Sequence, residues 1–554
     1  MTAATKPTYW LMDTNITRIS ETAPPIVEPI LLITQFYKSN NQARQKEIVD
    51  CLHRNLNNPF IDKIYLICEK PYTLREIGVN ANVNSSKITL ITINKRMNYF
   101  DAFTIVEDYG LNGYVIIANS DIFFDRSLES LYVSNASKEK KIYCQLRFEY
   151  TTTKLEQCSL FGPRTNSQDS WIFHSNYNVL KEHRKVFNFE LGIPGCDNHI
   201  TYLLSLLGYK LHNEPFFIRT YHNHASNVRT YTNDTKRVIS PYIFIRPLLT
   251  LATNHEVNWR YNINEENNQL RNYLEKKLKT NQPFLIPRIA GIENNFAYLG
   301  VCLSNNKITK DQLSYIQNVV SAMKNNAGIK LTSMKSILKY SQMYLEAFNL
   351  CDAYFDWDPT GNYIHHIALS HEFITTNFNK QRFWAVSLDI FHNIYNNPWT
   401  QALTGKRVLI ISPFIESMKL KVNCLPEIYG VDLFPNCEFS FISPPQTHAT
   451  LNSEEFDIEL EKFMDEIKKI KDTFDIALCS CGGYGNLVCA ELYKLDKSAI
   501  YVGGVLQMFF GIYGNRWLTE RPDVLRLFMN QHWSRPSETE KPQGHNLIEN
   551  GCYW

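Results

Sequence analysis

The sequence lacks the paired cysteine spacing that metal-binding and redox motifs use. Its 13 cysteines are scattered without a C-x-x-C pair, and only Cys479 and Cys481 stand two apart. Structural zinc sites take their ligands from closely spaced pairs, so this pattern argues against zinc. In a chain without an export signal, scattered cysteines are expected to be reduced thiols in the core.

The sequence also lacks an export signal and a clean membrane segment. Residues 1–30 have no basic region followed by an apolar core, which excludes an ordinary secretory signal. The run closest to a membrane segment, residues 498–514, is interrupted by four glycines and Gln507, so we expect a buried strand and loop there. We therefore expect a cytoplasmic protein with no transmembrane segment, in the host cytoplasm if the source is a virus.

Neither sign of charge is in excess. Lys and Arg number 57 against 55 Asp and Glu, which gives a formal net charge of +2. Such a balance gives no overall field to attract nucleic acid or anionic lipid, so any anion site must be local. With 554 residues, 44% of them hydrophobic, the chain is large enough for two globular domains with ordinary cores.

The chain does contain a regular alternation of short apolar runs and amphipathic stretches. In the first half the expected strands are residues 30–34, 63–67, 87–93 and 114–118, and the expected helices are residues 41–56 and 100–109. In the second half the expected strands are residues 407–412 and 475–480, and the expected helices are residues 454–474 and 486–495. This rhythm is typical of an α/β fold, so we predict two domains, each a largely parallel sheet with helices on both faces.

A polar, helix-favouring stretch separates the two halves. It covers residues 262–279 and is rich in Glu, Asn and Lys. We therefore predict an N-terminal extension (residues 1–28), a first α/β domain (29–255), a helical linker (256–280) and a second α/β domain (281–554).

The first candidate site follows the strand expected at residues 114–118. Ligands of parallel sheets bind just beyond the carboxyl ends of strands, and here the chain continues with Asn119, Ser120 and Asp121. A carboxylate at this place can hold Mg²⁺ or Mn²⁺, which neutralises the charge of a departing nucleotide diphosphate. The alternative for Asp121 is a turn aspartate that caps the next segment.

On these residues the first half resembles the nucleotide-diphospho-sugar transferases of the GT-A fold, over roughly residues 29–229. In that family a D-x-D motif ends a central strand and binds metal and diphosphate. Here Asn119 replaces the first aspartate and Asp121 keeps the last. The resemblance implies a nucleotide-sugar donor that contacts Asn119 and Ser120, with Mn²⁺ or Mg²⁺ on Asp121.

Four more residues fall where members of this fold contact base, ribose and phosphates: Arg44, Arg96, Tyr99 and Asp101. Arg44 lies in the first expected helix, and the other three follow the third expected strand. The resemblance implies that all four bind the nucleotide. The alternative for Arg44 is a solvated helix face, because exposed arginines are common.

Two aspartates are candidates for a catalytic base. An inverting transferase needs a carboxylate that takes a proton from the acceptor hydroxyl. Asp197, in the segment GIPGCDNHI, is the first choice, and Asp169, shortly before the apolar segment WIF, is the second. The alternative for Asp197 is the N-cap of the helix that follows.

Two histidines stand close together further along the chain. His222 and His224 are two apart in YHNHASNVR, so both imidazoles point to one face of an extended segment. Either side chain can complete the metal shell or hold the diphosphate, and Arg229 adds charge-assisted hydrogen bonds. The alternative is a surface strand with two exposed imidazoles.

The second half carries a short charged motif, PRIAGIE, at residues 287–293. It resembles the R-x-G-x-E signature of the GT-D type glycosyltransferases, with Gly291 where an acidic metal ligand normally stands. The resemblance implies donor binding by Arg288 and a catalytic role for Glu293. The alternative is a strand end with an ion pair.

A glycine-rich loop follows the strand expected at residues 475–480. Because glycines expose backbone N–H groups and a helix N-terminus favours phosphate, Gly482, Gly483 and Gly485 are candidates to cradle a diphosphate. Gln507 and Arg516 are candidates for polar contacts to a base or sugar. Tight packing of a strand against a helix explains the glycines equally well.

Together these patterns predict a metal-dependent, bifunctional glycosyltransferase. It would move a sugar from a nucleotide-sugar, with UDP-sugar favoured over GDP- and dTDP-sugar, to a glycan acceptor in bacterial or viral surface-polysaccharide or glycoprotein-glycan assembly. One alternative is a non-catalytic nucleotide- or glycan-binding protein, which the departures at Asn119 and Gly291 favour. Another alternative is a nucleotide-cofactor enzyme such as a methyltransferase or dehydrogenase. This chain lacks the acidic residue that ribose recognition needs at the end of the strand after the glycine-rich loop.

Overall fold

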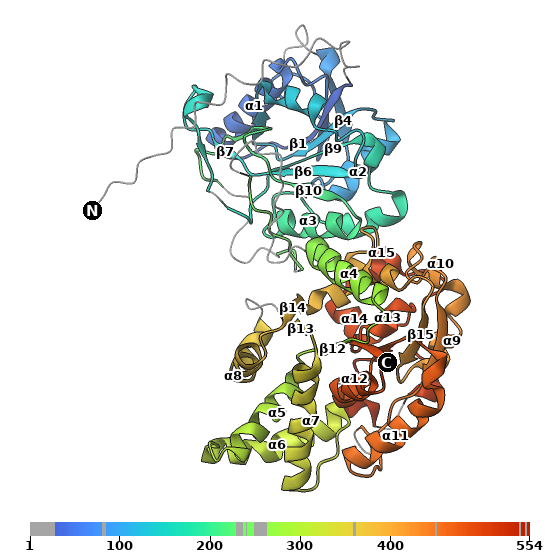
Figure 1. The fold of residues 1–554 in the computed structure, drawn as a ribbon. Helices are drawn as coiled ribbons and strands as arrows, with labels where there is room; N and C mark the ends of the chain where they lie inside the picture. Colours follow the sequence, from blue (N-terminus) through green and yellow to red (C-terminus); the bar gives the residue numbers. More distant parts are fainter. Residues whose placement is uncertain are drawn as a thin grey trace.

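The chain folds as an α/β protein with two large sheets (Figure 1). The computed structural model describes residues 28–79, 85–162, 164–228, 237–239, 241–248, 263–357, 362–448, 451–541, 544–548 and 551–554. We call the described residues up to 248 the first unit and those from 263 the second unit. In Figure 1 the first unit is the upper, blue-to-green part and the second is the lower, green-to-red part. The predicted fold class is confirmed.

The large sheet of the first unit has seven strands in the order β10-β6-β9-β4-β1-β2-β3. Their bounds are β1 Ile30–Phe36, β2 Lys63–Cys68, β3 Ile88–Thr92, β4 Tyr114–Ala118, β6 Lys141–Gln145, β9 Ser170–His174 and β10 Lys210–His212. Only β9 runs antiparallel to its neighbours β4 and β6. The four strands expected from the apolar runs are therefore β1 to β4, side by side in a parallel block.

Both faces of this sheet are buried, because successive side chains of a strand point to opposite sides. Ile30 and Leu32 pack with buried residues of α1 (Gln42–Asn57). Leu31 and Ile33 pack with α2 (Tyr99–Asp108) and α3 (Cys196–Leu206) on the other face. Burial on both faces explains why these strands read as continuous apolar runs rather than as alternating ones.

A smaller four-stranded sheet, in the order β5-β11-β7-β8, lies beside the carboxyl end of β4. Its strands are β5 Ile122–Phe124, β7 Phe148–Glu149, β8 Ser159–Leu160 and β11 Thr220–His222. The middle strand β11 pairs His222 with Ile122 on one side and with Glu149 on the other. This pairing brings a distant histidine next to the loop that carries Asp121.

The second unit is built on a parallel sheet in the order β12-β18-β17-β15-β16. The strands are β12 Leu285–Ile286, β15 Arg407–Ile411, β16 Glu438–Ile442, β17 Ile476–Cys479 and β18 Ser498–Tyr501, and a separate parallel pair is formed by β13 Ala353–Asp356 and β14 Gln381–Trp384. The helices are α5 Gly291–Ser304, α6 Lys310–Ala327, α7 Met334–Leu350, α8 Asn362–Asn377, α9 Ile415–Lys419, α10 Leu425–Tyr429, α11 Phe456–Ile470, α12 Gly485–Lys494, α13 Leu506–Phe509, α14 Asn515–Glu520 and α15 Pro522–Phe528.

The apolar run at residues 498–514 forms the buried strand β18 and a glycine turn, as predicted, and then the short helix α13 where a loop was expected. Within the described part of the chain, no helix is long and apolar enough to cross a membrane. The expected helix at residues 454–474 ends earlier, at Ile470, where a 3₁₀ turn over Lys471–Thr473 takes over.

The two units are in contact through α3. On α3, His199 Nε2 lies 3.6 Å from Asp523 Oδ2 at α15, and the ring of Tyr202 lies 6.1 Å from that of His392. Helix α4 (Ile263–Lys279) falls inside the predicted linker, and its Asn267 accepts from the N–H of Trp399 at 2.9 Å. This helix therefore packs on the rest of the second unit. The predicted domain boundaries stay predictions, and the extension at residues 1–28 lies almost wholly outside the described residues.

Candidate functional site

The site in the first unit is centred on Asp121, in the loop between β4 and β5. The β11–β5 pairing places His222 so that its Nε2 is 3.2 Å from Asp121 Oδ2. His224, two residues further on, has its Nδ1 at 3.3 Å from the same oxygen. One ligand atom from each of the three residues lies within 4.8 Å of the others. The structure thus brings the three predicted metal ligands together.

Arg44 reaches the same carboxylate from α1. Its Nη2 donates to Asp121 Oδ2 at 2.6 Å, and its Nη1 lies 3.2 Å from Glu47 Oε2. Its exposed fraction is 6%, so the side chain is not part of a solvated helix face. Glu47 in turn accepts from the backbone N–H of Ser226, two residues after His224, which ties the histidine segment to α1.

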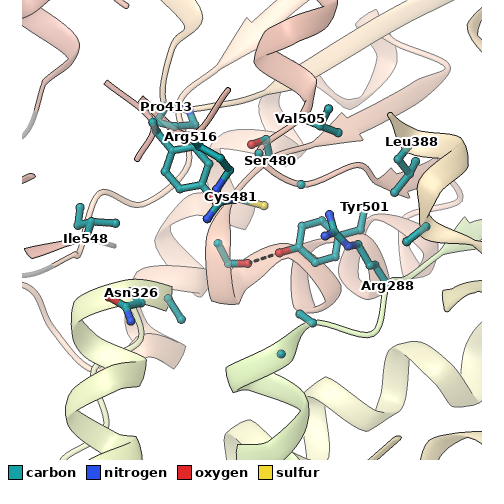
Figure 2. Close-up of a pocket in the computed structure, with 18 of the residues that line it drawn as sticks. Arg288, Asn326, Leu388, Pro413, Ser480, Cys481, Tyr501, Val505, Arg516 and Ile548 are labelled. Carbon is teal, nitrogen blue, oxygen red and sulfur yellow. Dashed lines mark hydrogen bonds between the residues drawn. The ribbon is translucent and has the colours of Figure 1, made fainter. Parts of the chain in front are cut away.

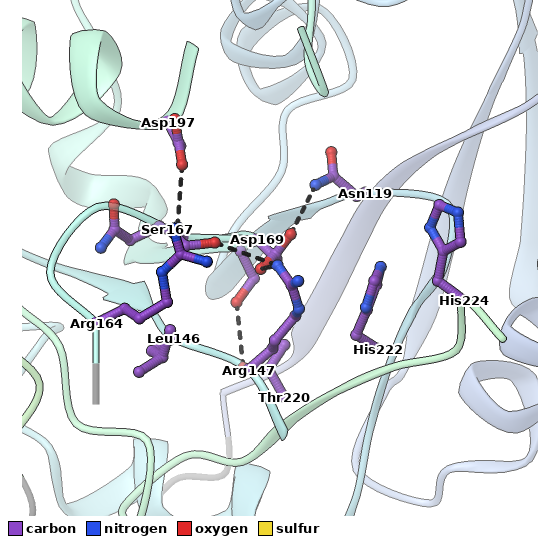
Figure 3. Close-up of polar contacts among 12 residues, drawn as sticks. Asn119, Leu146, Arg147, Arg164, Ser167, Asp169, Asp197, Thr220, His222 and His224 are labelled. Carbon is purple, nitrogen blue, oxygen red and sulfur yellow. Dashed lines mark hydrogen bonds and ion pairs between the residues drawn. The ribbon is translucent and has the colours of Figure 1, made fainter. Parts of the chain in front are cut away.

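Further polar contacts link His222, through Glu149 and Arg147, to Asp169, and Figure 3 shows the contacts of Asp169 with Arg147 and Asn119. Glu149 accepts from His222 Nδ1 at 3.1 Å and from Arg147 Nε at 2.8 Å. Arg147 Nη1 donates to Asp169 Oδ2 at 2.8 Å, and Asn119 Nδ2 donates to Asp169 Oδ1 at 3.3 Å. Asn119 therefore points towards Asp169, and Asp169 is engaged in an ion pair.

The charges of this cluster stabilise one another. Burial disfavours the ionised form of Asp121, but His222, His224 and Arg44 together hold its pKa well below the ordinary value. Burial likewise disfavours the charged His222, yet Asp121 and Glu149 raise its pKa to about 9. Burial opposes ionisation of Glu149 too, and the hydrogen bond from His222 and the charge of Arg147 lower its pKa to about 2.

The donor set fits a divalent transition metal such as Mn²⁺. One carboxylate and two imidazoles are ligands that such ions accept in proteins. Within the described residues, the buried Nε2 of His224 and the buried Oδ1 of Asn119 have no hydrogen-bond partner. Because a buried polar atom without a partner is costly, these atoms indicate a site built to receive something further.

Asp197 lies in the first turn of α3. The N-cap of α3 is Gly195, in the left-handed conformation at φ +85°, which excludes the alternative reading of Asp197 as the cap. Asp197 accepts from Gln168 N at 3.4 Å and from Asn198 Nδ2 at 3.0 Å. Burial, and then the negative charge of Asp169, raise its pKa to about 7. A carboxyl that titrates near neutral pH is suited to take up a proton.

Arg96 and Ser120 lie at the edge of this cluster. The Nη2 of Arg96 donates to Leu191 O at 3.0 Å. A Cβ on Gly192 would lie 3.1 Å from Arg96 Nη2 and 3.8 Å from Asn119 Oδ1, so the guanidinium and the amide flank one glycine. Ser120 is buried next to Asp121. Both residues are therefore near the predicted donor site.

Tyr99 and Asp101, both in α2, make contacts that stabilise the fold. The ring of Tyr99 is fully buried and packs edge-on against Trp171 at 4.9 Å. Asp101 closes a capping box with Asn98 and pairs with Lys95 at 2.8 Å. These contacts explain both residues without a bound nucleotide. Nucleotide binding by Tyr99 and Asp101 stays a prediction. Arg229 lies outside the described residues.

The second unit has a pocket of about 670 Å³ at the carboxyl ends of its parallel strands (Figure 2). The segments that follow β12, β15, β16, β17 and β18 all contribute lining residues. Lining residues include Arg288, Glu293, Asp389, Cys481, Arg516 and Arg521. The place agrees with the general rule for ligands of parallel α/β sheets.

Of the residues predicted in the second half, Arg288, Glu293, Gly482 and Arg516 line this pocket. Gly483 and Gly485 lie behind it: added Cβ atoms would lie 2.4 Å from Ile329 Cγ1 and 2.3 Å from the Tyr501 ring. Tight packing therefore explains these two glycines.

Gln507 is buried below the pocket and does not line it. Its Nε2 donates to Ile512 O at 3.3 Å and to Tyr553 O at 3.4 Å. These bonds tie the segment after β18 to residues near the end of the described chain. They give the amide partners that a buried polar group requires.

Sequence reasoning missed several residues that the structure places in these sites. In the first unit they are Glu47, Arg147 and Glu149. A faint signal existed for two of them, because Arg147 and Glu149 flank Phe148 with strand-like spacing. In the second unit Asp389, Arg521 and Trp384 come from segments that carry no motif.

No family model and no curated protein matches this sequence. Among solved structures, GalNAc-T7 with UDP, GalNAc and Mn²⁺ is similar over 35% of this chain and 44% of that one, at 10% identity and a TM-score of 0.26. A mannosyltransferase from Pyrobaculum calidifontis with GDP-Man and Mn²⁺ is similar over 38% and 61%, at 12% identity and a TM-score of 0.24. S. aureus TarS 1-349 is similar over 35% and 60%, at 11% identity and a TM-score of 0.26.

These similarities are partial in both directions. This chain covers less than two thirds of each of those chains, and the TM-scores are low. The class that fold and site define is therefore an α/β protein with a candidate cation site at a strand end.

Proposed function

We propose that the first unit is a divalent-metal-dependent glycosyltransferase that uses a nucleotide-sugar. The observation that carries the proposal is the convergence of Asp121, His222 and His224 beyond β4. Asp197, with its pKa near 7, lies beside Asp169, and Asp169 is hydrogen-bonded to Asn119 in the same loop. Sugar transfer from a nucleotide-sugar needs a cation site for the diphosphate and a group that accepts a proton. The loop after β4 carries Asp121 of the first and contacts the second through Asn119 and Asp169.

Asp121, His222 and His224 are the residues that would hold the cation. The bound ion would neutralise the negative charge that develops on the diphosphate as it leaves. Two imidazoles in the donor set favour Mn²⁺ over Mg²⁺, because Mg²⁺ prefers oxygen ligands and keeps its waters.

The chain's own side chains supply the proton transfer. Asp197 in its ionised form accepts the proton of the acceptor hydroxyl while that oxygen bonds to the anomeric carbon of the sugar. The bond between this carbon and the diphosphate oxygen breaks, and the electron pair leaves with the nucleoside diphosphate. Arg147 holds Asp169 in place, which keeps a negative charge near Asp197 and keeps its pKa high.

The finer parts of the proposal follow from the sequence. UDP-sugar is the favoured donor, ahead of GDP- and dTDP-sugar, and a glycan of surface-polysaccharide or glycoprotein assembly is the acceptor. A second transferase activity in residues 281–554 would use Arg288 and Glu293. It rests on the motif resemblance and on the pocket that both residues line, and tight binding of UDP to that pocket is the result that would support it.

One contact favours the alternative of a non-catalytic binding protein. Arg44 Nη2 lies 2.6 Å from the carboxylate oxygen that also faces both histidines. A guanidinium at this distance neutralises Asp121 without a metal. In a protein that only binds nucleotide or glycan, this ion pair would persist and no cation would be taken up.

Donor hydrolysis by the full chain separates the two functions. We expect release of nucleoside diphosphate from one of UDP-, GDP-, CMP- or dTDP-sugar, stimulated by Mn²⁺ and abolished by a chelator. His224→Gln should lower Mn²⁺ affinity by at least about 10-fold, since changes to groups that only orient a ligand already cost about 10–100-fold, and it should lower turnover as well. Asp108→Asn, at an exposed aspartate in α2, should change neither. Donor binding with no Mn²⁺ uptake and no turnover would leave the binding protein as the function.

A further inference from the structure

The pocket of the second unit is lined by three arginines, Arg288, Arg516 and Arg521, and by three carboxylates, Glu293, Asp389 and Glu520. Arg521 Nη2 lies 3.9 Å from Asp389 Oδ2, and Arg516 Nε lies 3.8 Å from Glu520 Oε1. Within the described residues, Arg288 has no ion pair and its buried Nε has no hydrogen-bond partner. The Arg288 guanidinium therefore keeps a donor that an anionic ligand can use.

Arg288 is held rigidly in this position. Its backbone N–H donates to Asn486 Oδ1 at 3.0 Å and its carbonyl accepts from Asn486 Nδ2 at 2.9 Å. Its Nη1 donates to Val502 O at 3.0 Å, and its guanidinium lies 4.7 Å from the centre of the Trp357 ring. A fixed guanidinium loses little entropy when it binds an anion, so the site is preorganised for one.

The glycine turn after β18 makes room for this guanidinium. Gly503 has φ +78°, and a Cβ there would lie 2.3 Å from Arg288 Nη1. Any side chain would push the arginine out of its position. In Figure 2, Arg288 lies beside Tyr501 on one side of the pocket, and Arg516 lies on the other.

The rest of the pocket has the character of a sugar site. Partly exposed aromatic rings line it, contributed by Trp357, Trp384, Tyr553 and Trp554. Flat aromatic faces pack against the apolar face of a pyranose ring. Glu293 and Asp389 also line the pocket, and carboxylates accept hydrogen bonds from sugar hydroxyls.

The same carboxylates disfavour a ligand with several negative charges. A nucleoside diphosphate would bring its phosphates near Glu293 and Asp389, and like charges at close range repel. The packed glycines Gly483 and Gly485 offer no open phosphate cradle. One anionic group on a hydroxyl-rich ligand fits the balance of charges better.

We propose that this pocket binds a saccharide that carries a single acidic group, a carboxylate or a phosphate, on Arg288. The sugar ring packs on Trp357 and Trp384, which are both partly exposed and both line the pocket. The volume of about 670 Å³ falls within the usual range for small-molecule pockets, about 300–1,000 Å³. This binding does not depend on sugar transfer in the first unit.

Titration of the full chain, followed by tryptophan fluorescence and calorimetry, tests the proposal. The probes are methyl glucuronide, glucose 6-phosphate, neutral methyl glucoside, inorganic phosphate and UDP. We expect one of the two acidic sugars to bind at least about ten-fold more tightly than the neutral glucoside and than phosphate. The neutral glucoside cannot make the charged hydrogen bond to Arg288, and phosphate has no ring to pack on the tryptophans. Which acidic sugar binds identifies the anionic group.

Variants connect the binding to the pocket. Arg288→Gln should weaken binding of the acidic sugar by about ten-fold or more, and Arg126→Gln, which removes the same charge from an arginine 78% exposed in its side chain, should not. If Arg288→Gln does not fold, Trp384→Leu tests the ring contact instead. His224→Gln, which leaves the Arg44–Asp121 pair intact, should leave this binding unchanged, which separates it from the first site.

Three results would overturn the proposal. They are tighter binding of UDP than of either acidic sugar, equal binding of the neutral and acidic sugars, and no binding of any probe. The first would assign the pocket to a nucleotide.

Discussion

At Asp121 one carboxylate oxygen faces three basic groups. Arg44 Nη2, His222 Nε2 and His224 Nδ1 lie 2.6, 3.2 and 3.3 Å from Oδ2. Removal of a buried carboxylate leaves its partner cation uncompensated, which costs about 3–5 kcal/mol. Loss of activity in an Asp121 variant would therefore mix a stability effect with a metal effect. His224 is the sharper position to test, because its replacement leaves the Arg44–Asp121 pair intact.

Asp197→Asn should separate catalysis from stability. As the proposed base, Asp197 should raise the rate by about 10²–10⁴-fold, so the variant should lose activity by that factor. The activity of the wild type should rise with pH around a midpoint near 7, the pKa of the Asp197 carboxyl. Initial rates from pH 5.5 to 8.5 at saturating donor and metal measure both effects.

The stability of the fold should fall as the pH rises through the pKa of Asp197, whereas the activity should rise. The folded-state pKa of Asp197 is raised from 3.8 to about 7, so its favourable contribution is present below about pH 4 and is lost as the pH rises through 7. At pH 8 the ionised side chain destabilises the fold, and Asp197→Asn should melt a few degrees higher than the wild type. At pH 5 the difference should shrink. Equal melting shifts at both pH values would contradict the assigned pKa.

At the scale of elements, the β17–α12 loop shows packing where a sequence motif suggests a ligand. Tyr340 OH donates to Gly483 O and Tyr501 OH donates to Gly482 O, each at 2.9 Å. Two tyrosines thus engage two of the loop's carbonyls. The close contact of Gly485 with the Tyr501 ring then brings α12 against β18.

Gly485→Ala should destabilise the second unit. The added Cβ would lie 2.3 Å from the ring of Tyr501, and overpacking of this kind typically costs about 1–3 kcal/mol. Thermal melting of the full chain without ligand should show the loss. In the double variant Gly485→Ala/Tyr501→Ala the two penalties should be less than additive, because the clash is gone. Additive penalties would show that the glycine is needed for another reason.

At the scale of the whole molecule, the two units share an interface under α3. Tyr202 of the first unit packs on His392, and the buried core that contains α3 extends into the second unit. Asp523, which faces His199, follows the α14 segment that lines the second pocket. The helix that carries Asp197 therefore rests directly on the second unit.

Gly208→Val should weaken this interface. Gly208 has φ +78°, and a Cβ there would lie 2.5 Å from Tyr395 Cβ. We expect calorimetric melting to change from one transition towards two, because the units then unfold more independently. The matched control is Gly110→Val, which meets the same left-handed backbone at φ +57° with no atom within 4 Å. If both variants melt alike, backbone strain rather than the interface explains the effect.

The sequence by itself determined the fold class and the places where ligands would be sought. Apolar runs such as residues 114–118 and amphipathic stretches such as residues 41–56 encode strand and helix locally, and both appear as β4 and α1. The rule that sites follow strand ends depends on order along the chain, so it located Asp121 without any contact being known. Arg288 was found from the short charged motif at residues 287–293.

Only the tertiary structure decided what these residues touch. Arg44 and Asp121 are 77 residues apart, and Asp121 and His222 are 101 apart. Their meeting depends on how α1, β4 and β11 pack, which spacing along the chain does not contain. The same holds for Gly485 against Tyr501 and for Trp357 beside Arg288. Local pattern fixes periodicity and burial tendency, whereas partners, distances and pKa values arise from long-range packing.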